Sequence, residues 1–279
     1  MRVTLTFLIH AGVKLFTERE SYHEQMVNFC VFKELIKKCI IIRQNIALTR
    51  RTASMDESKL RIIKVKESIL EDNDADADKL REELGAQKTF YLNVMSSPGS
   101  GKTSSILQLI ARLRDEFRIG VLEADIDGDC DTRTMLDAGV ASVQIHTGGM
   151  CHLDADMSRQ SLREIGSEDL DIVILENVGN LVCPAEFDTG AVKDLVILSV
   201  PEGDDKPLKY PLMFEKADVV LVNKIDALEV FDFDMDRFGK YVRMRNSDAD
   251  VFPVSAETGE GFDAAADWVR AAAREWLGR

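Results

Sequence analysis

The stretch SSPGSGKTS at residues 96–104 constrains the fold of this chain more than any other feature. It follows an apolar run at residues 90–95 and precedes a segment with a helical pattern. This strand, loop and helix order is the context in which a phosphate-binding loop occurs. The glycines let the backbone approach a phosphate closely, and the following helix directs its positive end towards it. The sequence therefore predicts a nucleotide-binding α/β fold.

The residues of this loop can be assigned individual roles. Lys102 is expected to bridge the β- and γ-phosphates, and the hydroxyl of Thr103 to ligate Mg²⁺. One position departs from the GxxxxGK[ST] pattern, because Ser96 stands where that pattern has glycine. The predicted nucleotide contacts in the loop are Pro98, Gly99, Ser100, Gly101, Lys102, Thr103 and Ser104.

Short apolar runs alternate with helical segments from this loop to the carboxyl end. The helical segments include residues 103–116 and 261–277. Continuous runs rich in Val, Ile and Leu are typical of strands covered on both faces, and repeated β–α units give parallel sheets with right-handed crossovers. We therefore predict a phosphate-loop NTPase fold, with a mainly parallel sheet and helices on both faces. The predicted strands are residues 89–95, 119–124, 142–146, 171–175, 195–200, 219–223 and 251–254.

A second motif, Asn223-Lys224-Ile225-Asp226, closes the apolar run at residues 219–222. A carboxylate at Asp226 can accept the N1–H and the exocyclic amino proton of guanine. Adenine lacks this donor pair, so such a site rejects ATP. Ser255 and Ala256, after the next strand, are expected to complete the base pocket through backbone N–H groups. The motif predicts selectivity for GTP.

Acidic residues follow two other strands. Glu176 closes the run at residues 172–175, with Gly179 three positions later, as in the element of GTPases that senses Mg²⁺ and the γ-phosphate. Asp125, Asp127, Asp129 and Asp131 follow another strand, and spacing alone does not say which of them reaches Mg²⁺ or the attacking water. Asn180 stands near the place of the water-positioning glutamine of some GTPases, so slow intrinsic hydrolysis is expected.

A thiol and imidazole set suggests a metal site. Cys151 and His152 are adjacent and Cys183 lies 32 residues on. Both segments follow predicted strands, so both lie at the carboxyl edge of the sheet, where ligands collect in open α/β folds. A Cys₂His set suits Zn²⁺ and can also take Ni²⁺.

Three longer stretches resemble a known family. Residues 146–157 (HTGGMCHLDADM), 176–188 (ENVGNLVCPAEFD) and 202–218 (EGDDKPLKYPLMFEKAD) are similar to the hydrogenase nickel incorporation (HypB) family of GTPase metallochaperones, over about residues 60–279. That family also begins its phosphate loop with Ser-Ser-Pro-Gly, which accounts for Ser96.

The resemblance implies particular roles and partners. Cys151, His152 and Cys183 would form a Ni²⁺ or Zn²⁺ site at a homodimer interface promoted by GTP, and Asp125 and Asp131 would be switch residues near Mg²⁺. The implied partners are the nickel metallochaperone HypA and the precursor of the hydrogenase large subunit. The predicted catalytic residues are Lys102, Thr103, Asp125, Asp131 and Glu176, with Thr103 and Asp125 as Mg²⁺ ligands.

This sequence differs from other members of the family at two places. Asp156 stands where some members have a second histidine, and an oxygen ligand there would favour a harder metal. The amino-terminal cysteine cluster or histidine-rich tract of other members is missing, which argues against a high-affinity nickel store. The alternatives are a GTPase chaperone for another metalloenzyme such as urease, or a non-catalytic metal-binding protein. The Cys-Pro-His motif of the urease type is absent from the sequence.

Composition limits the setting and the domain organisation. A net charge of −14 disfavours nucleic acid and anionic membranes as partners. Five cysteines without a disulfide spacing favour a reducing cytoplasm. We divide the chain into residues 1–55, an extension of unknown function that need not belong to the native protein; residues 56–88, a helical lead-in with a break at its acidic stretch and Gly85 as C-cap; and residues 89–279, the GTPase domain with its metal site.

Overall fold

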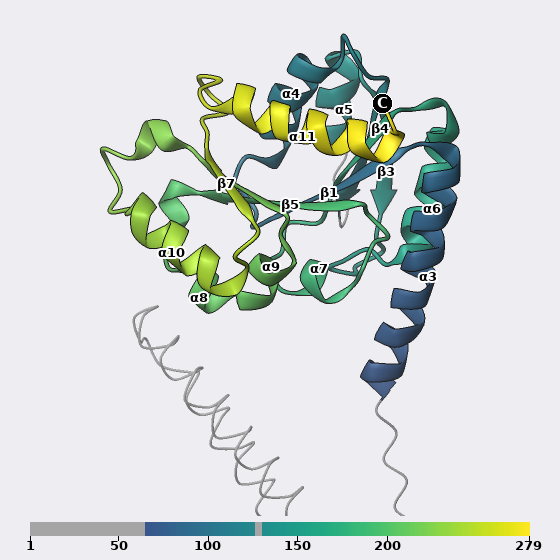
Figure 1. The fold of residues 1–279 in the computed structure, drawn as a ribbon, viewed down its shortest axis with the longest axis horizontal. Helices are drawn as coiled ribbons and strands as arrows, with labels where there is room; N and C mark the ends of the chain where they lie inside the picture. Colours follow the sequence, from purple (N-terminus) through teal and green to yellow (C-terminus); the bar gives the residue numbers. More distant parts are fainter. Residues whose placement is uncertain (1–64, 126–129) are drawn as a thin grey trace, which may run out of the picture. The chain divides into compact units, whose positions relative to one another are not determined.

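The computed structural model describes residues 65–125 and 130–279, with side chains described for residues 70–125 and 134–279. Within this part, seven parallel strands form one sheet in the order β3-β2-β4-β1-β5-β6-β7 (Figure 1). The predicted parallel sheet is confirmed, and each strand lies within two residues of its predicted bounds. The strands are β1 (Phe90–Ser96), β2 (Ile119–Asp125), β3 (Ala141–His146), β4 (Ile172–Glu176), β5 (Lys193–Ser199), β6 (Val219–Asn223) and β7 (Asp250–Pro253).

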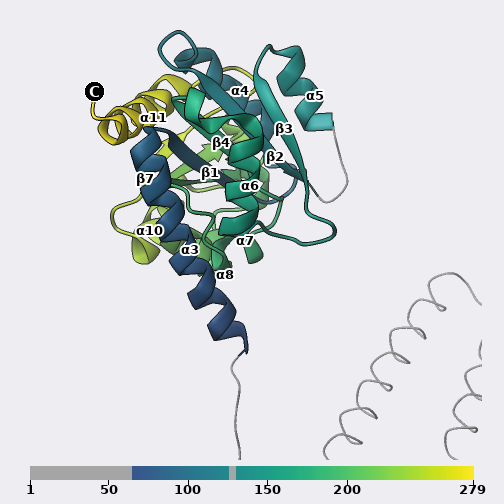
Figure 2. The ribbon, with the colours of Figure 1, turned by 90° about the vertical axis from the view of Figure 1, so that its right-hand side faces the viewer.

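Helices cover both faces of the sheet, as predicted. One face carries α4 (Lys102–Leu113), α5 (Cys130–Asp137) and α11 (Phe262–Leu277). The other face is divided: α3 (Val65–Gln87) and α6 (Ala155–Ile165) lie side by side over one half, and the remaining helices cover the other half (Figures 1 and 2). Those remaining helices are α7 (Cys183–Glu186), α8 (Lys206–Lys209), α9 (Pro211–Lys216) and α10 (Met235–Arg245).

The buried strands alternate their side chains between two cores. On β1, Leu92 and Val94 pack beneath α4 and α11, whereas Tyr91 and Met95 pack towards the opposite layer. All seven residues of β1 are buried. Because both faces are covered, this strand needs apolar side chains at nearly every position, which is why its sequence has no polar alternation.

The structure corrects the prediction for the helix before β1. Helix α3 continues without a break through the acidic stretch, because every third or fourth residue faces the core: Ala77, Leu80 and Leu84 are buried. Gly85 is not the C-cap. The helix ends instead at Gln87. The next residue, Lys88, adopts a left-handed φ of 59°, and the N–H of Thr89 donates to the carbonyl of Leu84 at 3.0 Å.

The strand order places ligand-binding loops together at one edge. From β1 the chain fills one half of the sheet with β2, β3 and β4, and then the other half with β5, β6 and β7. This reversal at β1 is the topological switch point at which ligands bind in open α/β sheets, beyond the carboxyl ends of the strands. The loops that follow β1, β2, β3, β4 and β6 all leave from that edge because the strands are parallel.

Candidate functional site: a phosphate loop between two pockets

The segment after β1 has the geometry of a phosphate loop. Gly99 and Gly101 both adopt left-handed backbone, with φ of 76° and 92°. Gly101 is also the N-cap residue of α4, and no side chain caps the first turn of this helix. The N–H groups at the start of α4 are therefore available to an anion, in the region where the helix dipole favours negative charge.

Ser96 does not disturb the loop. Among the described non-glycine residues only Lys88 and Lys224 have positive φ, so position 96 does not need the conformational freedom of glycine. The buried Ser96 hydroxyl donates to the carbonyl of Ser97 at 2.8 Å and accepts from the Ser100 hydroxyl at 2.7 Å. The Ser96 side chain therefore stabilises the loop through hydrogen bonds to two of its residues.

Asn223 connects the phosphate loop to the segment predicted to read the base. Its amide nitrogen donates to the carbonyl of Ser100 at 2.8 Å. Its amide oxygen accepts from the N–H of Lys224 at 2.8 Å and from that of Ala256 at 3.0 Å. The Lys224 ammonium in turn donates to the carbonyl of Gly99 at 2.6 Å. The three segments predicted from sequence are thus held together by direct hydrogen bonds.

On one side of the loop lies a pocket of about 390 Å³. Asp226 is exposed towards solvent and its carboxylate accepts a hydrogen bond of 2.5 Å from the hydroxyl of Ser255. This bond orients the carboxylate while leaving oxygen lone pairs for a ligand. The lining residues are Gly101, Ser104, Asn223, Lys224, Asp226, Ala256 and Glu257; Glu257 was not anticipated from the sequence.

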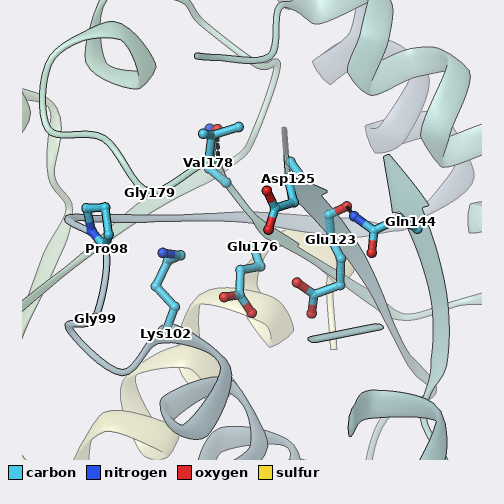
Figure 3. Close-up of a pocket in the computed structure, with 11 residues that line it drawn as sticks. Pro98, Gly99, Lys102, Glu123, Asp125, Gln144, Glu176, Val178 and Gly179 are labelled. Atoms are coloured by element: carbon cyan, nitrogen blue, oxygen red, sulfur yellow. Dashed lines mark hydrogen bonds between the residues drawn. The ribbon is translucent and has the colours of Figure 1, made fainter. Parts of the chain in front are cut away.

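On the other side lies a second pocket, of about 310 Å³, which collects carboxylates (Figure 3). Lys102 extends into it, near Glu176 (Figure 3). Glu176 is buried at the end of β4 and its Oε1 accepts from the Thr103 hydroxyl at 2.9 Å. Asp125 lines the same pocket from the end of β2. The structure therefore brings together the predicted residues Lys102, Thr103, Asp125 and Glu176.

Gly179 closes this pocket against the phosphate loop. A Cβ added there would lie 3.1–3.3 Å from atoms of Pro98, including its backbone nitrogen. The predicted γ-phosphate-sensing segment and the phosphate loop are thus in close contact, which a larger residue at position 179 would disturb.

Some residues of the acidic loop after β2 lie outside the described part. Asp127 and Asp129 are among these residues. Asp131 belongs to the first turn of α5, and its side chain lies outside the described part.

Sequence reasoning assigned no role to three polar residues of the second pocket: Glu123, Gln144 and Asn177. Glu123 is buried and stands opposite Glu176 in the register of β2 and β4. The available signal was a charged residue inside an otherwise apolar strand. Gln144 Nε2 donates to the carbonyl of Glu123 at 3.1 Å.

The predicted metal ligands lie on two neighbouring loops. Cys151 and His152 follow β3, and their Sγ and Nδ1 atoms are 4.0 Å apart. Cys183 begins α7, and a hydrogen bond with Cys151 is the main cause that raises the pKa of its thiol. His152 stacks on Phe187, with 3.7 Å between ring centroids. In the described ranges, no three His, Cys, Asp or Glu side chains are grouped closely enough to hold a metal ion. A single chain thus presents neighbouring donors rather than a closed site.

Proton equilibria at these loops favour the metal-binding form of His152 but not that of Cys183. Burial lowers the pKa of His152, against the opposing influence of Asp154 and Glu186, so the imidazole is neutral over a wider pH range. Asp156 is engaged within its own helix, where it accepts from Gln160 at 2.7 Å.

Fold and site together define a phosphate-loop nucleotide-binding protein with the machinery of a nucleotide hydrolase. Residues 90–253 match the family described as CobW/HypB/UreG, nucleotide-binding domain. Hydrogenase maturation factor HypB of Azotobacter vinelandii is 43% identical over 212 residues, or 76% of this chain and 70% of that protein. Hydrogenase/urease maturation factor HypB of Helicobacter pylori is 42% identical over 199 residues, or 70% and 81% of the two chains. The chain belongs to the HypB family of hydrogenase maturation factors.

Solved structures of HypB proteins are also similar to this chain. HypB from Helicobacter pylori in complex with nickel is 38% identical, with a TM-score of 0.68 over 73% of this chain and 96% of that one. HypB from Archaeoglobus fulgidus is 35% identical, with a TM-score of 0.68 over 73% and 100% of the two chains. None of the helices in the described residues is long and apolar enough to cross a membrane.

Proposed function

We propose that this chain is a GTP-hydrolysing metallochaperone that delivers nickel during the maturation of [NiFe]-hydrogenase. One observation carries the proposal: the phosphate loop lies between a pocket that holds Asp226 and a pocket that holds Lys102 and Glu176. The Cys151 and Cys183 loops leave from the same edge of the sheet. Nucleotide and metal would therefore be handled at adjoining places.

Specificity for GTP follows from Asp226 in the first pocket. An oriented carboxylate accepts two hydrogen bonds from guanine, and an adenine ring would leave it without a donor. Glycine backbone and Lys102 would hold the phosphates, as in other phosphate-loop proteins.

The second pocket fits a magnesium ion. Thr103 supplies a hydroxyl, and Asp125 and Glu176 supply carboxylate oxygens, the hard ligands that Mg²⁺ prefers. When bound, the ion would neutralise charge that develops on the phosphates. Asp131 is the further switch residue proposed from the resemblance. Because Asn180 is not a water-positioning glutamine, we expect turnover below about 1 per second without a partner.

The cargo is proposed to be Ni²⁺, with Zn²⁺ as the other ion that suits Cys151, His152 and Cys183. The similar Helicobacter pylori protein was solved in complex with nickel. Three ligands leave a tetrahedral ion one short, and a symmetric partner chain can supply the remainder. GTP would drive release only if metal affinity differs between the nucleotide states.

The setting and partners are proposed with the same function. We place the protein in the cytoplasm as a GTP-promoted homodimer, working with the nickel metallochaperone HypA and the hydrogenase large-subunit precursor, and not with nucleic acid or membranes. Urease as an additional client appears in the names of the Helicobacter relatives, while those from Azotobacter, Rhizobium and Escherichia coli name hydrogenase alone. The division at residues 55 and 88 remains a prediction.

Release of labelled phosphate from GTP tests the catalytic part. The full chain should hydrolyse GTP and not ATP, and Lys102→Ala should reduce turnover by at least about 100-fold, because the lysine stabilises transferring phosphate charge. Lys240→Ala, an exposed lysine on α10, is the matched control and should behave like the parent. A folded parent protein that binds GTP without hydrolysing it would favour the non-catalytic alternative instead.

A further inference from the structure

A chain of directed hydrogen bonds runs from the second pocket into the opposite core layer. The backbone N–H of Val178 donates to Asn177 Oδ1 at 2.8 Å. Asn177 Nδ2 donates to Asn93 Oδ1 at 3.0 Å, and Asn93 Nδ2 donates to Asp194 Oδ1 at 2.8 Å. Asn93 and Asn177 are buried, and Asn177 and Val178 line the pocket beside Glu176. All three bonds point the same way, towards Asp194.

The Asp194 carboxylate fixes the direction of these three hydrogen bonds. An ionised carboxylate only accepts hydrogen bonds, whereas an amide side chain can present either its oxygen or its nitrogen. With Asp194 as acceptor, Asn93 must turn its nitrogen to β5 and its oxygen to Asn177. Asn177 must then turn its nitrogen to Asn93, which leaves its oxygen for the N–H of Val178. If both amides were reversed, the Asn177 nitrogen would face that N–H, and the last bond would be lost.

The last bond of the chain orders a segment that touches the phosphate loop. Val178 precedes Gly179, which lies against Pro98 so closely that an added Cβ would be 3.1–3.3 Å from atoms of that proline. A small displacement of the backbone at residues 178–179 therefore alters the wall of the pocket in which phosphate is expected.

The Asp194 end of the chain reaches the metal-ligand loop. Asn93 and Asp194 line a cavity of about 30 Å³ together with Pro184, Ala185, Phe187, Asp188 and Thr189, the residues that follow Cys183. Burial, together with the nearby Asp218 and Asp188 carboxylates, raises the pKa of Asp194 to about 7 against the opposing influence of the Asn93 hydrogen bond and Arg81. Lys216 lines the cavity, and Lys193 pairs with Asp218 at 2.6 Å.

We propose that Asp194 and Asn93 are positioning residues for nucleotide hydrolysis, which act through Asn177 to hold the backbone at residues 178–179 against the phosphate loop. The inference rests on the proposed hydrolytic function. It assigns a role to a charged residue within the sheet that touches neither nucleotide nor metal. It also places the control of hydrolysis next to the loop that carries Cys183.

The test is the pH dependence of GTP hydrolysis by the full chain and by Asp194→Asn. In the parent, kcat should rise with pH through about 7 as Asp194 ionises and directs the chain. Asp194→Asn should lower kcat above that pH by about threefold to tenfold, remove the inflection, and change the Kd of a non-hydrolysable GTP analogue by less than about twofold. Asn93→Leu, which keeps the branched shape of the side chain and removes the amide, should give the same loss, and the double variant should lose little more.

Asp171→Asn is the control for a merely structural carboxylate. Asp171 precedes β4 at the opposite edge of the sheet and accepts from Arg118 and Arg279. Its replacement should lower stability and keep the pH profile of the parent. An unchanged kcat and profile in folded Asp194→Asn and Asn93→Leu would overturn the positioning role alone. A loss of analogue affinity equal to the loss of kcat would also overturn it. A parent that does not hydrolyse GTP would overturn the proposed function as well.

Discussion

At the scale of single residues, Asp226 is the side chain to which we assign the choice of base. It is exposed in the first pocket, it is oriented by Ser255, and it belongs to the short 3₁₀ turn Ile225–Ala227 that Asn223 and Lys224 fasten to the phosphate loop. The left-handed φ of 64° at Lys224 is unusual for a lysine and is held by the hydrogen bonds around it.

Asp226→Asn should transfer preference from GTP to XTP. Guanine presents two donors to the carboxylate, whereas an asparagine amide accepts one and opposes the other with its own N–H. Two charge-assisted hydrogen bonds correspond to a loss of GTP affinity of about 10²- to 10⁴-fold. Competition of GTP, XTP and ATP for a fluorescent nucleotide measures the preference.

Asp232→Asn serves as the control for that change. Asp232 is also an exposed carboxylate, in the loop before α10 and outside the lining of the pocket. It should leave the order of affinities unchanged. If Asp226→Asn retained the GTP preference of the parent, Asp226 would have no part in reading the base.

At the scale of elements, the phosphate loop depends on how closely β6 approaches it. A Cβ on Gly101 would come within 2.5 Å of the Asn223 amide nitrogen, which is hydrogen-bonded to Ser100. Gly101→Ala should therefore break this link and abolish measurable nucleotide binding, in addition to about 1 kcal/mol of backbone strain at a φ of 92°. Calorimetric titration with a GTP analogue provides the measurement.

Gly166→Ala is the control for Gly101→Ala, because it separates backbone strain from the steric clash with Asn223. Gly166 is the C-cap of α6 with a φ of 69°, and its added Cβ would meet nothing within 4 Å. It should lose similar stability and bind nucleotide normally. Equal binding by the Gly101 and Gly166 variants would show that contact with Asn223 is not required.

The parallel strands and the course of the phosphate loop were predicted correctly, and this success has a physical reason. Buried parallel strands require unbroken apolar runs, and a phosphate loop requires its glycines, so both appear directly in the sequence. The unbroken course of α3 and the role of Glu123 depend on tertiary packing. Ala77 and Leu80 face the core between charged residues, and Glu123 is placed beside Glu176 only by strand register. The sequence placed Cys151, His152 and Cys183 at one edge of the sheet, yet the distances among these side chains could not be predicted.

The two metal-ligand loops should bind metal more tightly as pH rises. Thiols must lose a proton to bind Ni²⁺ or Zn²⁺. Because the pKa of Cys183 is raised, protons compete with the metal through neutral pH, whereas the lowered pKa of His152 makes its imidazole available earlier. The affinity should therefore increase from about pH 6.5 to 8.5, with about two protons released per ion.

Cys183→Ser tests the assignment of that dependence. It should weaken metal binding and reduce the protons released to about one, while GTP binding persists. Competition with a chromophoric chelator gives the affinity, and calorimetric titration in two buffers of different ionisation enthalpy gives the number of protons released. Ser158→Cys is the control. It adds a thiol at a buried position on α6 and supplies no ligand to these loops. Identical titrations of parent and Cys183→Ser would remove Cys183 from the site.

At the scale of the whole molecule, the two loops with the predicted metal ligands Cys151 and Cys183 also carry exposed apolar side chains. Val182 is 50% exposed beside Cys183, and Met150 is 44% exposed beside Cys151. Apolar groups next to an incomplete set of metal ligands are suited to a symmetric contact, in which each chain covers the apolar surface of the other and shares ligands. Nucleotide binding and metal binding would then be linked to dimerisation, because each ligand favours the same dimeric state.

Sedimentation of the full chain with a GTP analogue and Ni²⁺ tests this linkage. The mass should double from that of a 31.2 kDa monomer when both are present, and less completely with either alone. Val182→Asp should remain monomeric under all conditions, because it buries unpaired charges against each other at the interface. Val230→Asp, at a valine that is 80% exposed after β6, should dimerise like the parent. If Val182→Asp dimerised normally while Val230→Asp did not, the interface would lie on the base-pocket side of the sheet, and the metal loops could not share ligands between chains.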